Sequence, residues 1–255
     1  MSVYIDNCEV IENSQVAENI YFLKTIAPNI AREVYPGQFC NILVSDYGTP
    51  LLRRPFSVAF REKNIIGFLY DIVGLGTELL SKVNVGEKIS IEGPLGNGFN
   101  IDDSLEVALL LGGGIGIAPL PFLREKLQKR GINTLTFWGS KTSGKLNLSL
   151  FDNIYFATDD GSEGFQGNVV ESVGNLWSSI SHANLKAYAC GPTPMLIAAQ
   201  NFFEGKNIPL EISVESRMAC GFGICQGCPI KSADSDEYKL VCKDGPVFNS
   251  KEVIL

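Results

Sequence analysis

The sequence predicts a multidomain protein with an antiparallel β-barrel, a doubly wound α/β domain and a small cysteine-rich C-terminal domain. Three observations predict it: short apolar runs fill roughly the first hundred residues, longer apolar runs then alternate with helical patterns, and four of the seven cysteines lie near the end. The 255 residues are enough for about two domains or one large one. We place the domains at residues 1–101, 102–212 and 213–255.

The first hundred residues alternate short apolar runs with turn signals. Runs of this length and spacing, bounded by glycine and proline, are typical of an antiparallel barrel or sandwich. The runs are Tyr21–Lys24, Gln38–Val44, Phe56–Phe60, Ile65–Val73 and Lys88–Glu92.

The pattern changes at Leu105. The continuous apolar run Leu105–Leu111 leads into a glycine turn, and Ala118–Arg130 then shows helical spacing. Further apolar runs alternating with helical patterns predict a parallel sheet covered on both faces. These are strand-like runs at Thr134–Trp138, Asn153–Thr158 and Leu185–Ala189, and a helical pattern at Met195–Glu204. From Glu211 onward there is little periodic structure, and we expect a core too small to stand without a bound centre.

The strongest chemical signal is Cys220-x4-Cys225-x2-Cys228-x13-Cys242. Three thiolates so close on one loop can surround only a compact centre, and this spacing is that of plant-type [2Fe–2S] ligation. The intervening glycines suit a loop that needs positive φ and closely approaching N–H donors; they are Gly221, Gly223 and Gly227. The alternative is structural zinc, which usually gathers two close cysteine pairs.

Two glycine turns predict a nucleotide site. The first follows Leu109–Leu111 and contains Gly112, Gly113, Gly114 and Gly116; the second contains Cys190 and Gly191 ahead of Pro192. A strand, a glycine turn and a helix start present N–H groups and a positive helix end to a pyrophosphate. Such turns also serve strand–helix packing, but two of them at the carboxyl ends of parallel strands define one crevice.

A second phosphate-type site is predicted in the barrel half. An Arg beside a proline-stiffened strand can pair a phosphate bidentately, and a following glycine turn can offer N–H groups, a hydroxyl and a helix start. An Arg-Arg pair alone is most often a solvated surface feature. The residues are Arg53, Arg54, Pro55, Phe56 and Ser57, followed by Asp71, Ile72, Val73, Gly74, Gly76 and Thr77.

Three of these motifs resemble the flavin, nicotinamide and nucleotide signatures of the ferredoxin reductase superfamily. They are Arg54-x-Phe56-Ser57, Gly112-Gly113-x-Gly-Ile-Ala-Pro119 and Cys190-Gly191-Pro192-x-Pro194-Met195. With its cysteine segment, the chain from about Val10 to Cys242 resembles the electron-transfer subunits of class 1B dihydroorotate dehydrogenases. One departure is Phe56, where many superfamily members carry Tyr.

The resemblance implies FAD on the barrel, NAD on the α/β domain and a [2Fe–2S] cluster that passes electrons to a separate FMN-bearing catalytic subunit in pyrimidine biosynthesis. It also implies a heterotetramer with two copies of each subunit, diaphorase activity of this chain alone, and a place for Cys190 near the nicotinamide.

Asp159 and Asp160 bear on the choice of nucleotide. Superfamily members that prefer NADP typically carry Ser-Arg after a similar Ala-Thr pair, whereas Ala157-Thr158 is followed here by two carboxylates. Carboxylates accept hydrogen bonds from ribose hydroxyls and repel a 2′-phosphate, which favours NAD. The alternative is that both aspartates simply begin the turn at Gly161-Ser162.

Charge and composition exclude several function classes. With 21 Lys and Arg against 28 Asp and Glu, the net charge of −7 makes nucleic acid an unfavourable partner. We expect no membrane segment, because no stretch of 18 uncharged apolar residues occurs, and we expect a cytoplasmic protein. The only histidine, His182, is interpreted as a surface residue.

Two rival functions stay open at this point. One is the small subunit of an NADP-dependent sulfide dehydrogenase or bifurcating transhydrogenase, against which the four cysteine ligands and Asp159 argue. The other is a regulatory nucleotide-binding module with structural zinc and no flavin.

Overall fold

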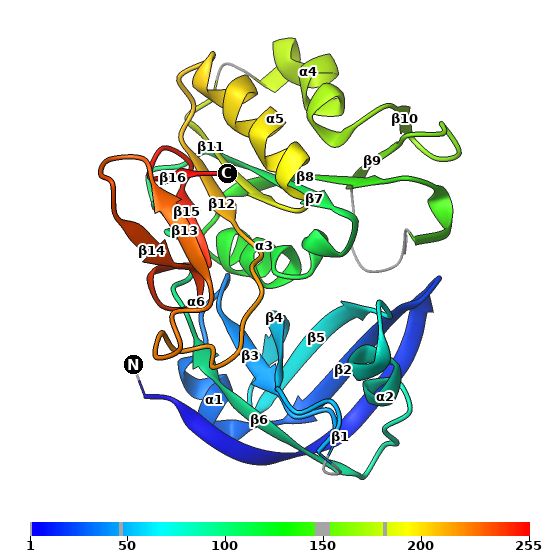
Figure 1. Cartoon of the computed structure of the whole chain (residues 1–255). Helices are drawn as coiled ribbons and strands as arrows, with labels where there is room; N and C mark the ends of the chain where they lie inside the picture. Colours follow the sequence, from blue (N-terminus) through cyan, green and yellow to red (C-terminus); the bar gives the residue numbers. More distant parts are fainter. Residues whose placement is uncertain (1, 46–47, 146–153, 181–182) are drawn as a thin grey trace.

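The computed structural model describes residues 2–45, 48–145, 154–180 and 183–255, so His182 lies outside the described residues. Figure 1 shows a barrel at one end, an α/β layer at the other, and a small sheet at the side. Among the described helices, none is long and apolar enough to cross a membrane.

Six antiparallel strands close the barrel in the order β1-β2-β5-β4-β3-β6. Alternating side chains point inward, and the core they build includes Val58, Ile66 and Phe68, each fully buried. The strands are β1 (Tyr4–Ala17), β2 (Ile20–Ile26), β3 (Phe39–Ile42), β4 (Arg54–Glu62), β5 (Ile65–Asp71) and β6 (Lys88–Leu95), with short helices α1 (Pro28–Glu33) and α2 (Leu75–Leu80) between them.

The second layer is a seven-stranded sheet in the order β10-β9-β8-β7-β11-β12-β15. All its pairs are parallel except the last, in which β15 runs antiparallel to β12. The strands are β7 (Val107–Gly113), β8 (Asn133–Ser140), β9 (Ile154–Thr158), β10 (Phe165–Gln166), β11 (Leu185–Cys190), β12 (Leu210–Ser213) and β15 (Val247–Asn249).

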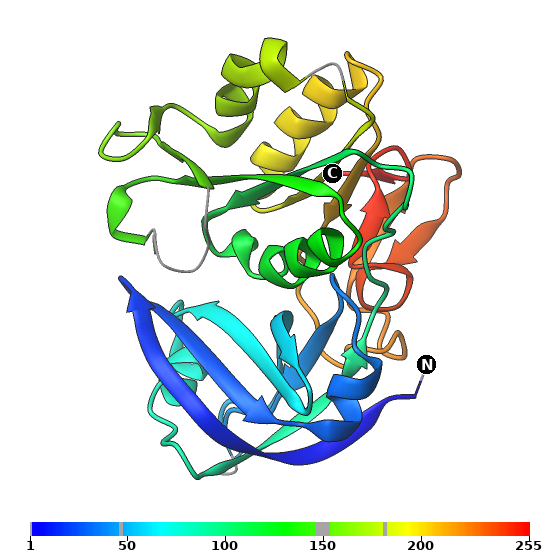
Figure 2. The ribbon, with the colours of Figure 1, turned by 180° about the vertical axis from the view of Figure 1, so that it is seen from behind.

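Helices cover both faces of this sheet (Figures 1 and 2). Helices α4 (Val169–Ile180) and α5 (Thr193–Glu204) pack on one face, where Val173 and Phe203 are fully buried. Helix α3 (Leu120–Lys129) packs on the other, facing the barrel, and its Phe122 belongs to the barrel core. The short 3₁₀ turns η1 (Gly114–Ile117) and η2 (Ser143–Lys145) follow β7 and β8.

The C-terminal segment forms a three-stranded sheet in the order β14-β13-β16. Its elements are β13 (Pro229–Ser232), β14 (Tyr238–Leu240), α6 (Val241–Asp244) and β16 (Val253–Ile254). Its buried residues, Leu240, Val241 and Val253, share one apolar core with Leu109 and Leu111 of the central sheet. The segment is therefore stabilised by packing on the α/β domain.

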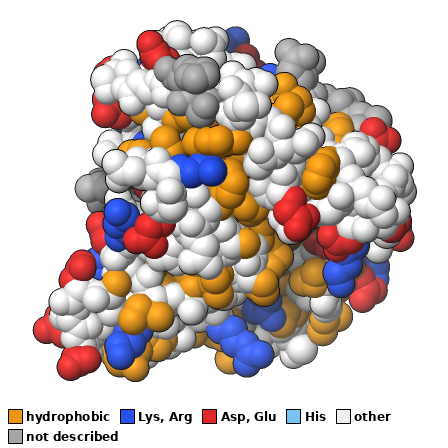
Figure 3. Space-filling view, turned by 90° about the horizontal axis from the view of Figure 1, so that it is seen from above, with side chains coloured by type: hydrophobic (Ala, Val, Ile, Leu, Met, Phe, Trp, Pro, Cys, Tyr) orange, Lys and Arg blue, Asp and Glu red, His pale blue; other side chains and the backbone are white. Residues whose placement is uncertain are grey.

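The predicted fold class is confirmed: a closed antiparallel barrel, a doubly wound α/β sheet and a small C-terminal unit. Figure 3 looks down on the end of the molecule that carries α4 and α5. On that face, Lys and Arg side chains are scattered among acidic and uncharged ones and form no continuous basic surface.

Candidate functional site

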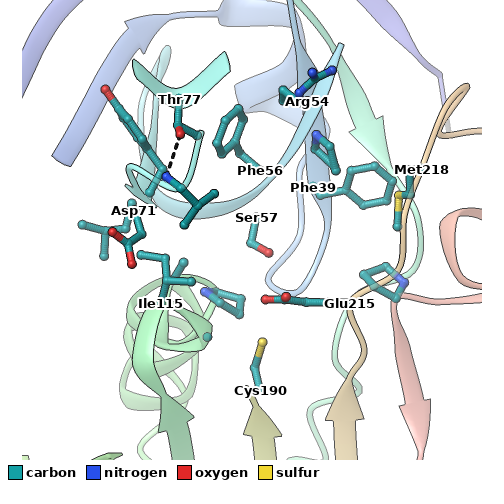
Figure 4. A pocket seen from close by; sticks show the side chains of 18 of the residues that line it. Phe39, Arg54, Phe56, Ser57, Asp71, Thr77, Ile115, Cys190, Glu215 and Met218 are labelled. Carbon is teal, nitrogen blue, oxygen red and sulfur yellow. Dashed lines mark hydrogen bonds between the residues drawn. The ribbon is translucent and has the colours of Figure 1, made fainter. Parts of the chain in front are cut away.

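A cleft of about 510 Å³ lies between the barrel and the α/β sheet and is lined from both sides (Figure 4). It brings together residues from three of the sequence motifs. They include Arg54, Pro55, Phe56, Ser57, Asp71, Val73, Gly74, Gly76, Thr77, Gly116 and Cys190. Motifs more than a hundred residues apart in the chain therefore meet in one cavity.

On the barrel side, an aromatic side chain of β4 lines the cleft. Phe56 is 8% exposed, and its ring makes an edge contact with Tyr70 of β5 at a centroid distance of 5.7 Å. Tyr70 also lines the cleft. A fixed aromatic edge at a cavity wall suits a flat ring system, which gains from stacking and from exclusion of water.

The structure separates the two adjacent arginines. Arg53 donates from both terminal nitrogens to Ser90 of β6, at 2.9 Å to the carbonyl and 2.8 Å to the hydroxyl. Arg54 instead lines the cleft and is held by the carbonyl of Leu52 at 2.6 Å. Of the pair, Arg54 is the one placed to meet an anion in the cleft.

The Gly74 turn fits closely around Arg54. A Cβ atom at Gly76 would lie 3.1 Å from Arg54 Nε, so glycine leaves the guanidinium its space. Thr77 Oγ1 accepts hydrogen bonds from the N–H groups of Val73 (2.9 Å) and Gly74 (3.3 Å) and donates to the Gly74 carbonyl. The Thr77 hydroxyl thus closes the turn itself.

Asp71 offers a buried acceptor to the cleft. Its Oδ2 forms an ion pair with Lys145 of η2, which reaches over from the α/β domain. Its Oδ1 is buried and has no hydrogen-bond partner in the structure. A buried acceptor without a donor is costly, so this atom fits a hydroxyl of a bound molecule.

On the α/β side, the two glycine turns pack directly on each other. Strands β7 and β11 are parallel neighbours with Gly112 opposite Cys190. A Cβ atom at Gly113 would lie 2.5 Å from Met195 Sδ, and one at Gly116 would lie 2.4 Å from the Cys190 carbonyl oxygen. These glycines are therefore required for close packing, while Gly114, with φ of 55° and open space around it, is required by its backbone conformation.

Glu215 is a cleft residue that the sequence analysis missed. Figure 4 shows its carboxylate, the Ser57 hydroxyl and the Cys190 thiol pointing toward one another. Although Glu215 is exposed toward the opening, loss of water around its carboxyl raises the pKa above the ordinary value. Burial, followed by the nearby Glu215 charge, raises the pKa of Cys190 to about 12. The available signal was position, since Glu215 follows β12 at the carboxyl edge of the sheet.

Several predicted residues lie outside the cleft. Among the described residues, those that line it do not include Ile72, Gly113, Gly114, Asp159, Asp160 or Gly191. Asp160 Oδ1 accepts from the Ser162 N–H at 3.0 Å and from its hydroxyl at 2.6 Å, which lowers the pKa of Asp160. Asp159 is exposed, and the described hydrogen bonds of this residue engage only its N–H. Asp160 therefore takes part in the turn, and its role toward a nucleotide stays a prediction.

The four cysteines come together as two pairs. Cys228 and Cys242 are buried with their sulfurs 3.2 Å apart. The Cys225 N–H donates to Cys220 Sγ at 3.4 Å, and the Gly227 N–H donates to Cys225 Sγ at 3.4 Å. Although partial burial raises the pKa of Cys220, the N–H donors of Cys225 and Phe222 outweigh it and lower the value to about 6.

Two cysteine pairs fit a two-iron centre. Each iron of a [2Fe–2S] cluster has two bridging sulfides and takes two thiolates, so each pair supplies the number of sulfurs that one iron needs. The cysteine loop, residues 220–228, has the positive φ expected at Gly221 (82°) and Gly223 (87°).

Gly227 does not have a positive φ. A Cβ atom there would lie 3.3 Å from Cys225 Sγ, so this glycine gives its N–H group access to the Cys225 sulfur.

Comparison with known proteins gives one consistent family. Residues 215–254 match the iron–sulfur cluster binding domain of dihydroorotate dehydrogenase B. The chain is 38% identical over 258 residues to the dihydroorotate dehydrogenase B (NAD(+)) electron transfer subunit of Fusobacterium nucleatum, with 98% of each chain covered. It is 39% identical to the subunit of the same name from a Geobacillus species, covering 96% of this chain and 97% of the relative.

Among solved structures, the chain is similar to the NADH-dependent reduced ferredoxin-NADP oxidoreductase, studied for flavin-based electron bifurcation. The TM-score is 0.86 at 28% identity, covering 98% of this chain and 90% of that one. A ferredoxin reductase of carbazole 1,9a-dioxygenase shares the fold, with a TM-score of 0.69 at 20% identity, covering 83% and 69% of the two chains. From the matches over nearly its whole length, the chain belongs to the family of dihydroorotate dehydrogenase B (NAD(+)) electron transfer subunits.

Proposed function

We propose that this chain carries electrons between NAD(H) and an FMN-bearing dihydroorotate dehydrogenase catalytic subunit, through FAD and a [2Fe–2S] cluster. The observation that carries the proposal is that one short segment, which begins at Glu215, runs directly from the cleft to the cysteine loop. Glu215 and Met218 line the cleft, and the ligand cysteines begin at Cys220, two residues further along. A cofactor in the cleft and a cluster on the cysteine loop would therefore be neighbours.

The cleft residues are assigned to FAD by their chemistry. Arg54 would pair the pyrophosphate, Phe56 would contact the isoalloxazine edge, and Asp71 Oδ1 would accept a hydroxyl of the cofactor. Pro55 stiffens the strand, and Ser57 would face the part of the isoalloxazine that exchanges electrons. Of the remaining turn residues, Val73, Gly76 and Thr77 would shape the wall around Arg54, while Ile72 lies next to the turn and outside the cleft.

The α/β turns are assigned to NAD. We propose that Gly113, Gly114, Gly116 and Gly191 let the nucleotide approach the carboxyl ends of β7 and β11, with Cys190 beside the nicotinamide. Asp159 would accept hydrogen bonds from a ribose, while Asp160 holds the turn. Bound FAD supplies the chemistry that converts a two-electron hydride into single electrons. The protein would hold the electron donor and acceptor close to each other and exclude water from between them.

The cysteine loop is proposed to hold the cluster and also to contact the partner subunit. We propose that Cys220, Cys225, Cys228 and Cys242 are the four ligands. Phe222 and Ile224 are 43% and 77% exposed beside them, and apolar side chains exposed together mark a docking surface. The assembly would be a heterotetramer with two copies of each subunit.

Domain boundaries at residues 1–101, 102–212 and 213–255 are part of the same proposal. They separate the flavin, nucleotide and cluster functions, although the C-terminal segment returns β15 to the central sheet. A cytoplasmic location is also proposed, because ligand thiolates require a reducing compartment.

The experiment that tests the function compares two assays on the isolated chain. We expect the purified chain to reduce an artificial acceptor with NADH and to leave dihydroorotate unoxidised. The cleft is fully assigned to dinucleotides, and proton abstraction from dihydroorotate needs a positioned base that the partner would supply. Dihydroorotate oxidation by the partner-free chain would overturn the division of labour.

A second prediction concerns nucleotide choice. We expect Asp159→Ser with Asp160→Arg to raise the ratio of kcat/KM for NADPH to that for NADH by about tenfold, which corresponds to about 1.4 kcal/mol, because the change removes carboxylate repulsion and adds a partner for the 2′-phosphate. Asp160→Asn alone is the comparison variant, because its amide oxygen can still accept the Ser162 hydrogen bonds while it removes one carboxylate charge and adds no phosphate partner. An unchanged ratio in the double variant would remove these residues from nucleotide selection.

A further inference from the structure

We propose that Asn41 of the flavin barrel is a positioning residue for the iron–sulfur cluster, holding the Cys220 end of the cysteine loop against the barrel. The inference rests on the proposed function only in taking the four cysteines as cluster ligands. Asn41 lies on β3 and is separated from Cys220 by 179 residues, so this contact links two domains.

Asn41 is buried, and its side-chain amide donates hydrogen bonds to two acceptors. It is 2% exposed, and its Nδ2 donates to the Cys220 carbonyl oxygen at 3.1 Å and to Glu92 Oε2 at 3.3 Å. Glu92 lies opposite Asn41 on β6 and is itself 9% exposed. Since a carbonyl oxygen can only accept a hydrogen bond, the amide NH₂ group must face Cys220, and Glu92 Oε2 lies within hydrogen-bond distance of the same group. Glu92 therefore orients the Asn41 side chain toward the loop.

The loop approaches this amide so closely that a side chain would not fit. A Cβ atom at Gly221 would lie 2.2 Å from Asn41 Nδ2, and Gly221 has φ of 82°. The residue directly after the first ligand is thus fitted onto Asn41. In contrast, a Cβ atom at Gly223, which has a similar φ of 87°, would meet the side chain of Lys243, at 2.9 Å from Cδ, 3.2 Å from Cβ and 3.4 Å from Cγ, and not Asn41.

Strand β3 also contributes to the flavin cleft. Phe39, two residues before Asn41, lines that cleft, and Figure 4 shows it beside Met218 of the segment that leads into the loop. One short strand therefore contacts both the cleft and the backbone of a ligand cysteine. Partners that orient a ligand affect metal affinity by about 10- to 100-fold when removed, and Asn41 would act through the backbone of Cys220 in this way.

The test uses the full-length protein and measures the rate of iron release to a chelator together with the EPR spectrum of the reduced cluster. We expect Asn41→Leu to release iron about tenfold faster, with altered g values and with unchanged FAD content. Gln200→Leu is the matched control. It removes the hydrogen bond of 2.8 Å that the Gln200 side-chain amide donates to the carbonyl of Ser250, which also lies in the C-terminal segment. The control should release iron at the wild-type rate.

A second pair of variants approaches the contact from the loop. Gly221→Ala and Gly223→Ala carry a similar backbone cost, but only the first meets Asn41, so Gly221→Ala should release iron several-fold faster than Gly223→Ala. This pair decides the case if Asn41→Leu does not fold. Equal rates for the two glycine variants, or wild-type rate and g values in folded Asn41→Leu, would overturn the role of Asn41. A wild-type protein without iron and sulfide would instead overturn the proposed function.

Discussion

Cys225→Ser is expected to lower the iron and sulfide content by more than about tenfold while leaving FAD bound. A serine hydroxyl is a poor replacement for an iron-bound thiolate, and Cys225 lies on the exposed part of the cysteine loop, outside the residues that line the flavin cleft. The effect should be large because loss of one thiolate leaves one iron without its full ligand set. Metal analysis, the visible spectrum and flavin content measure the result.

Cys8→Ser is the matched control for this change. Cys8 is also a free thiol, but it is 1% exposed in the barrel core and its sulfur donates only to the Asp6 carbonyl. It should keep the wild-type iron content. Full iron content and an unchanged EPR spectrum in Cys225→Ser would show that the ligand assignment is wrong.

Phe222→Asp should lower coupled dihydroorotate:NAD+ activity of the reconstituted complex by about 30-fold, the size of a loss of roughly 2 kcal/mol at an interface hot spot. Phe222 is 43% exposed on the loop that carries three of the proposed ligands, and a buried carboxylate at an apolar interface is costly. Diaphorase activity with NADH should be spared, because it needs no partner.

Ile197→Asp provides the control for a surface charge. Ile197 is 39% exposed on α5, a helix on the far face of the sheet from the barrel. The same charge there should leave coupled activity unchanged. Equal losses in both variants, or equal losses of coupled and diaphorase activity in Phe222→Asp, would argue against docking at the loop.

The sequence predicted those parts of the site that depend on local spacing. Cys220, Cys225 and Cys228, the Arg54-to-Ser57 strand and the two glycine turns each fall within a short segment, so local spacing is enough to single them out, and their roles stay predictions. The parallel sheet was predictable for the same reason, since buried parallel strands are nearly continuous apolar runs, as in Leu109–Leu111.

The residues that could not be predicted act across long sequence separations. Asn41 contacts Cys220, and Lys145 pairs with Asp71, only because the barrel and the other domains pack together. The sequence pattern did not reveal strand β1, because register shifts interrupt its alternation of apolar and polar residues. One of these shifts lies between Val10 and Glu12. Strand β15 is three residues long and has no periodicity to detect.

The role of Thr77 shows a different limit. A hydroxyl in a glycine turn can serve a ligand or the turn, and the sequence does not distinguish the two. The structure shows that the Thr77 hydroxyl bonds to the backbone of Val73 and Gly74. Asp160 behaves likewise, bonding to Ser162.

The central claim is that electrons pass between NADH and the cluster within this one chain. Anaerobic addition of NADH to the isolated wild-type protein, followed by low-temperature EPR, tests it most directly. The account predicts the signal of a reduced [2Fe–2S] cluster without any partner present. Bleaching of the flavin absorbance with no cluster signal, in a sample whose cluster dithionite does reduce, would contradict it.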